Sequence, residues 1–119
     1  MKIAVNQLAD DIVHIAPSGR MDALGVEDIS IPFTAAAATR KALVVVDLAQ
    51  VDFLASVGLR LFFSSARALQ QRGGRMALAA AQPDVGAVLD ATGVAQLISI
   101  YPTLDEACAA LRGGAANPI

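Results

Sequence analysis

The chain has 119 residues, of which 55% are hydrophobic and 17% are charged, and its formal net charge is -2. This length and composition exclude a disordered chain and predict a single compact domain that buries a sizeable core without staples. The slightly acidic balance, with no basic face, argues against nucleic-acid binding.

The targeting and redox signals favour the cytoplasm. Cys108 is the only cysteine, so no internal disulfide can form, and we expect its thiol to be a small buried hydrophobe. The first six residues have the pattern of a strand rather than of a signal peptide. No apolar run approaches the ~20 residues that a membrane span needs. We therefore expect a cytoplasmic protein that does not insert directly into a membrane.

The first half of the chain predicts a hairpin and one ambiguous segment. Residues 3–5 and 12–17 have strand patterns, and Asp10 and Asp11 between them suit a hairpin turn. Residues 22–40 are harder to assign. Pro32 either opens a short helix that ends near Arg40 or kinks a longer one, and we favour the short helix because proline is tolerated in a first turn.

The centre of the chain has the clearest pattern. Residues 43–48 form a β-branched run rich in valine, which is typical of a central strand covered on both faces. From Val57 to Gln71 the apolar spacing becomes helical, and Gly73 with Gly74 suits the left-handed end of that helix.

The remaining elements alternate between strand and helix. The patterns predict a strand at 75–79 and then a helix from Pro83 to about Ala91, ended by Thr92 and Gly93. A short strand at 97–100 and a final helix, capped by Thr103 with Glu106 three residues on, complete the chain. The fold class is therefore α/β, with a mixed sheet of about five strands (an N-terminal hairpin, then parallel strands) packed against about four helices. We expect one domain over 1–111 and a flexible tail over 112–119.

Ser56 is the candidate functional residue. It lies where a loop after the central strand meets a helix, so its hydroxyl is offered beside free backbone amides. One interpretation is that Ser56 only caps the helix. The other is that it accepts a phosphate, whose charge would meet those amides and the positive end of the helix dipole. The two interpretations are compatible.

The sequence offers little for catalysis. Its one histidine, His14, lies in a predicted strand, and nothing ties it to Ser56 or to an acid. One cysteine and one histidine make a poor metal site, and neither a dinucleotide-binding nor a P-loop glycine motif is present. We expect no enzyme activity, no metal ion and no cofactor.

The run from Val51 to Leu59 resembles the signature of STAS domains, the family named for sulfate transporters and anti-sigma factor antagonists. Further matches follow in the family's order: residues 19–23 after the second strand, 45–48 in the central strand, 73–75 in a turn and 89–94 in a Thr-Gly segment. The resemblance spans roughly residues 1–111, nearly the whole chain.

The resemblance implies a bacterial switch protein without catalysis of its own. In the antagonists, the serine that matches Ser56 is phosphorylated by a serine kinase that is also the anti-sigma factor, and a metal-dependent serine phosphatase restores it. The unphosphorylated form binds the kinase and frees the sigma factor. Asp22 matches an aspartate beside that serine, on the partner surface. The partner-binding positions expected here are Asp22, Ala55, Ser56, Val57, Gly58 and Arg60.

Two departures from the family pattern matter. Ala55 replaces the usual aspartate and removes a negative charge beside the acceptor, whereas Val57 leaves Ser56 as the only hydroxyl in the motif. Gly58 either packs under a neighbouring loop or gives a kinase access to Ser56. Arg60 lies either on a solvated face or against a partner. The alternative to a phosphorylated switch is a constitutive adaptor subunit of a transport complex, for example one that moves lipids.

Overall fold

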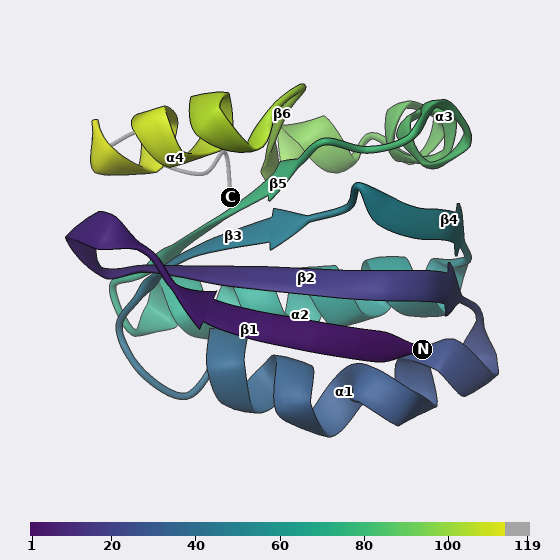
Figure 1. Cartoon of the computed structure of the whole chain (residues 1–119), viewed down its shortest axis with the longest axis horizontal. Coiled ribbons are helices and arrows are strands. Elements are labelled where there is room, and N and C mark those ends of the chain that lie inside the picture. The colour runs from purple at the N-terminus through teal and green to yellow at the C-terminus, as the bar shows by residue number, and fades with distance from the viewer. Residues whose placement is uncertain (114–119) are drawn as a thin grey trace.

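The computed structural model describes residues 1–113, which form a mixed six-stranded sheet packed against helices (Figure 1). The strands are β1 (Lys2–Gln7), β2 (Ile12–Met21), β3 (Leu43–Asp47), β4 (Gln50–Leu54), β5 (Arg75–Ala79) and β6 (Ser99–Tyr101). The helices are α1 (Ala23–Ala37), α2 (Ser56–Gln71), α3 (Pro83–Thr92) and α4 (Leu104–Arg112), with short 3-10 turns η1 (Ala9–Asp11) and η2 (Val94–Gln96).

The sheet confirms the predicted hairpin followed by parallel strands. Its order is β1-β2-β3-β5-β6, and β1 pairs antiparallel with β2 while the other pairs are parallel. Strand β2 is long enough to have two successive partners on one side. Its first half pairs with β3 and its second half pairs with β4. Strand β4 was not predicted, since the chain between the central strand and Ser56 was expected to be a loop.

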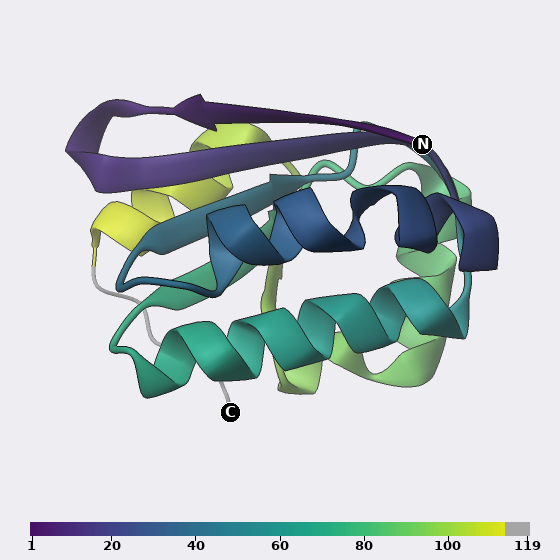
Figure 2. The same ribbon diagram turned by 90° about the horizontal axis from the view of Figure 1, so that it is seen from below.

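The core has two parts, one on each face of the sheet. In β3, Val44 and Val46 belong to the larger cluster, which also contains the buried hydrophobic side chains of α1 and α2. Val45 points to the opposite face and packs in a smaller cluster with residues of α4. Figure 2 shows α1 and α2 side by side, with their N-terminal ends at the same end of the molecule. The prediction that the central strand is covered on both faces is confirmed.

The prediction of a short helix opening at Pro32 is wrong. Helix α1 begins at Ala23 and continues through Pro32 to Ala37. An interior proline costs about 3 kcal/mol. However, α1 buries Val26, Ile29 and Phe33 on one stripe, and each large apolar side chain contributes about 1.5–3 kcal/mol on burial. Burial of these side chains therefore stabilises α1 by more than Pro32 destabilises it. The ring of Pro32 lies at the exposed surface.

The helix ends follow the sequence more closely. Gly73 and Gly93 have φ angles of 84° and 70°, in the left-handed region that terminates helices. Thr103 accepts a hydrogen bond from the amide of Glu106 at 3.1 Å, as the capping pattern predicted. Strand β6 begins at Ser99, two residues later than expected, because η2 and Leu97 precede it. Of the expected tail, Arg112 ends α4, and residues 114–119 lie outside the described part.

None of the helices in residues 1–113 is long and apolar enough to cross a bilayer.

Candidate functional site

Ser56 is the first residue of α2 and follows β4 after a single connecting residue, Ala55. The side chain of Leu54 is buried and anchors the end of β4 in the core. Ser56 itself is exposed. A strand that ends in the core and a helix that starts at once therefore present the serine hydroxyl at the surface.

The interpretation of Ser56 as the helix cap is wrong. Ala55 occupies the N-cap position with extended backbone angles (φ -98°, ψ 171°), and no side chain caps α2. The carbonyl oxygen of Ala55 accepts from the amides of Gly58 at 3.0 Å and Leu59 at 3.3 Å. Within residues 1–113 the Ser56 hydroxyl and the amides of Ser56 and Val57 have no hydrogen-bond partner. The Ser56 hydroxyl therefore makes no hydrogen bond that stabilises the start of α2.

Asp22 caps the neighbouring helix. Its Oδ1 accepts from the amide of Gly25 at 2.8 Å, and its Oδ2 lies 3.5 Å from Nε of Arg20. The hydrogen bond from Gly25 and, less strongly, the Arg20 guanidinium hold the pKa of the Asp22 carboxyl below its ordinary value of 3.8. Asp22 is therefore an ionised cap beside a cation.

The pairing of β2 with β4 places the two helix starts together. Met21 is in register with Leu54, and the amide of Ala55 donates to the carbonyl oxygen of Met21 at 3.0 Å. Asp22 directly follows Met21, and Ser56 directly follows Ala55. Two segments more than 30 residues apart in sequence thus form one surface at the carboxyl end of these strands.

Gly58 is a packing residue. It is buried, and a Cβ built on it would lie 2.6 Å from Cδ1 of Leu54 and 3.2 Å from Cβ of Met21. Any side chain at this position would displace the residues that support Ser56. Of the two readings of Gly58, the geometry favours tight packing.

The other predicted positions around Ser56 differ in exposure. Ala55 and Val57 are half-buried, and Val57 packs against the larger core cluster. Arg60 is exposed and lies one turn further along α2.

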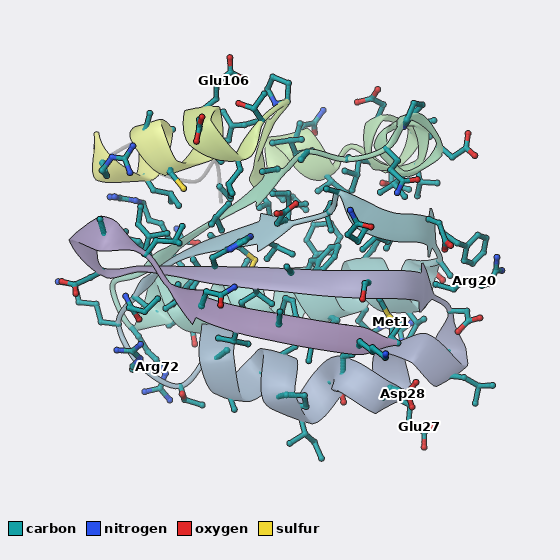
Figure 3. The ribbon with its side chains drawn as sticks, in the orientation of Figure 1. Met1, Arg20, Glu27, Asp28, Arg72 and Glu106 are labelled. Atoms are coloured by element: carbon teal, nitrogen blue, oxygen red, sulfur yellow. The ribbon has the colours of Figure 1, made fainter. Side chains whose placement is uncertain are left out.

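One contact at this surface was not foreseen. The guanidinium of Arg20 stacks over the ring of Phe53 at 4.1 Å from its centroid. Phe53 remains 38% exposed, an unusual environment for phenylalanine, and Arg20 projects outward at this end of the molecule (Figure 3). The sequence indicates this contact only if residues 50–54 are recognised as a strand, because Phe53 then occupies an outward-facing position in it.

His14 also has a partner that the sequence did not indicate. Its Nε2 lies 2.9 Å from Oδ2 of Asp47, between β2 and β3. Strand residues rise about 3.3 Å each, so positions 14 and 21 of β2 are roughly 20 Å apart. The His14–Asp47 pair therefore lies far from Met21 and Ser56 and does not act as a base for the serine. Nowhere in residues 1–113 do three metal-ligating side chains gather.

The family model for the STAS domain matches residues 4–107. The chain belongs to the STAS domain family. A STAS relative, BtrV of Bordetella bronchiseptica, is named as a candidate anti-sigma factor antagonist and is 24% identical over 94% of this chain and 96% of its own.

Solved structures share the fold of this chain. An anti-sigma factor antagonist from Mycobacterium paratuberculosis superposes with a TM-score of 0.83 and 28% identity, covering 93% of each chain. The anti-sigma factor antagonist SpoIIAA in its unphosphorylated form gives a TM-score of 0.75 at 23% identity, over 94% of this chain and 97% of that one. The predicted α/β fold and the family resemblance are both confirmed.

Proposed function

We propose that this STAS domain is a partner switch of the anti-sigma factor antagonist kind, controlled by reversible phosphorylation of Ser56. In the unmodified state it binds a serine kinase that also acts as an anti-sigma-type inhibitor. Phosphorylation by that kinase releases it, and a metal-dependent serine phosphatase restores the binding form. The similarity to anti-sigma factor antagonists supports the class of function.

The observation that carries the proposal is the uncommitted hydroxyl of Ser56 at the first position of α2. It is exposed and caps nothing, so a kinase can take it without breaking a structural bond. A serine used as a cap would have to leave the helix amide before reacting. In the observed geometry Ser56 is therefore more accessible to a kinase than it would be as a helix cap.

A phosphate at Ser56 suits this environment. It adds a charge of about -1.5 to -2 and three acceptor oxygens. The amides of Ser56 and Val57 and the positive end of the α2 dipole all favour an anion there. We expect the fold to tolerate the phosphate, so its effect falls on whatever protein docks at this end of the domain.

The surrounding surface provides the means of recognition. Asp22 and Arg20 supply fixed charges beside Ser56, and Phe53 offers an exposed aromatic face of the kind enriched at interfaces. A phosphate close to the ionised Asp22 adds a second anion that an approaching partner must desolvate or repel. Loss of binding follows from local charge rather than from a change of fold.

The domain itself performs no chemistry in this account. The one histidine, His14, does not serve Ser56 as a base, because its imidazole is engaged by Asp47 between β2 and β3. The kinase and the phosphatase supply both group transfers, and the STAS domain contributes the acceptor and the docking surface.

A constitutive adaptor of a transport complex is the competing function, and in that case Ser56 stays unmodified. Intact-mass measurement on protein isolated from its native cells distinguishes the two. A fraction heavier by one phosphate, absent from the Ser56→Ala variant, supports the switch. A single unmodified mass under all growth conditions, with co-purification of a permease or ATPase, contradicts it.

A further inference from the structure

A groove of about 620 Å³ runs along α2 from Ser56 towards the C-terminal half of the helix. Its apolar lining comes from Leu59 and Phe63 of α2 and from Leu97, which follows η2 on the far side. Leu97 is 40% exposed, so part of this apolar surface is open to solvent. From position 56 to position 67 a helix rises about 16 Å, which is three turns.

The charge of the groove is of one sign. Arg60 and Arg67 both line it, and no acidic residue does. Helix α2 carries no acidic side chain in any of its 16 residues, although the chain as a whole has a net charge of -2. The groove is therefore a cationic, partly apolar strip on an acidic protein, and its charge complements an anionic occupant.

Arg60 lies next to Ser56 at one end of the groove. Ser56 and Arg60 are four residues apart on α2, a spacing at which helix side chains meet. A phosphate on Ser56 would attract the Arg60 guanidinium through a charge-assisted hydrogen bond. The modification would therefore remove a cation from the groove and introduce an anion at its edge.

We propose that this groove docks an acidic amphipathic helix of the partner, with Leu59, Phe63 and Leu97 receiving its apolar side chains and Arg60 and Arg67 its carboxylates. The mode is that of a helix laid in a groove beside α2. This docking mode rests on the switch proposed above, and in it Arg60 binds a carboxylate of the partner in the unmodified state and the phosphate of Ser56 in the modified state. Arg67 lies two turns further on and serves the partner only.

The test uses two synthetic peptides of about 15 residues, long enough to form a helix. Both have leucines on one face, and the other face carries glutamates in one peptide and lysines in the other. Affinities are measured for the unmodified protein and for protein with phosphoserine incorporated genetically at position 56. The variants are Arg67→Glu, Arg60→Gln and Lys2→Glu. Lys2→Glu makes the same charge change as Arg67→Glu on exposed β1, at the opposite edge of the sheet from β6.

We expect the acidic peptide to bind and the basic peptide to bind at least about tenfold more weakly. Arg67→Glu should weaken the acidic peptide by about tenfold or more, and Lys2→Glu by less than about twofold. Equal affinities of the two peptides, equal effects of the two charge reversals, or no saturable binding of the acidic peptide would overturn the proposal. So would equally arginine-dependent binding of anionic vesicles, which would assign the groove to a lipid surface.

The phosphoserine arm separates this inference from the switch on which it rests. Weaker acidic-peptide binding in the phosphoserine protein, with the loss reduced in Arg60→Gln, supports the role of Arg60. If Arg67 matters but the phosphate does not, the groove stands and the switch fails. If phosphoserine abolishes binding of the cognate kinase while Arg67→Glu leaves it unchanged, the switch stands and the groove is not its docking site.

Discussion

The amide of Ala55 donates to the carbonyl oxygen of Met21 at 3.0 Å, and this bond lies directly before both residues of the candidate site, Asp22 and Ser56. It fixes the residue before Ser56 against the residue before Asp22. It also completes the β2–β4 pairing, because Met21 and Leu54 are in register. Ser56 and the α1 cap, Asp22, are therefore held in place by the pairing of β2 with β4.

Replacing Ser56 by alanine should abolish phosphorylation and leave the fold almost unchanged. The hydroxyl caps nothing, so we expect the free energy of unfolding to change by less than about 0.5 kcal/mol, as at ordinary surface sites. Kinase labelling and urea unfolding of the same protein check both parts. Label that persists on Ser64 or Thr92 would show that the acceptor is elsewhere, and a loss above about 1 kcal/mol would restore the capping role.

Gly58→Ala should destabilise the domain although alanine is the better helix former. The new methyl would lie 2.6 Å from Leu54 and 3.2 Å from Met21, and overpacking of this kind costs about 1–3 kcal/mol. Gly86→Ala in α3 is the matched control, since its Cβ would meet nothing within 4 Å. We expect the control to gain about 0.5–1 kcal/mol. An equal gain in the free energy of unfolding in the two variants would contradict the packing role of Gly58 and favour a role in giving a kinase access to Ser56.

Asp22→Ala should lower the free energy of unfolding at neutral pH through loss of the α1 cap. Because the folded-state pKa of Asp22 is lowered, the ionised carboxylate stabilises the fold above its ordinary value of 3.8. That contribution is lost as the pH falls below 3.8 and through the lowered folded pKa. The difference between wild type and variant in urea unfolding should therefore narrow as the pH falls below 3.8. A gap independent of pH would show that the charge does not matter.

Cys108 should react slowly with thiol reagents in the folded protein. Its side chain is 5% exposed in the smaller core cluster, and burial raises the pKa of its thiol. We expect labelling by a chromogenic disulfide to become fast only when urea unfolds the chain. Rapid labelling under native conditions would mean that α4 opens readily or that the thiol is functional.

The sequence was a good guide where the pattern is local and strong. The valine-rich run at 43–48 predicted β3, and the glycines at 73 and 93 predicted two helix ends, because both signals depend on the residue types themselves. Strand β4 was missed since only Val51 and Leu54 are buried in it, and its extended form comes from pairing with β2. Such long-range pairing has no local signature.

The errors at the site have the same origin. Whether Ala55 or Ser56 occupies the N-cap position is a shift of one residue, which the bond from Ala55 to Met21 decides. The rule that proline opens helices was outweighed at Pro32 by burial of Ile29 and Phe33 against the sheet. Likewise, the Arg20–Phe53 contact required β4 to be in place. Tertiary contacts decided each of these points.

The most direct test of the account is the affinity of the kinase that labels Ser56 for the unmodified domain and for the phosphoserine-56 domain. Amide chemical shifts recorded on both forms confirm that the backbone is retained. We predict binding at least about tenfold weaker for the phosphorylated form, with shift changes confined to residues near Asp22 and Ser56. Equal affinities for the two forms would contradict the proposal that a phosphate on Ser56 operates the switch.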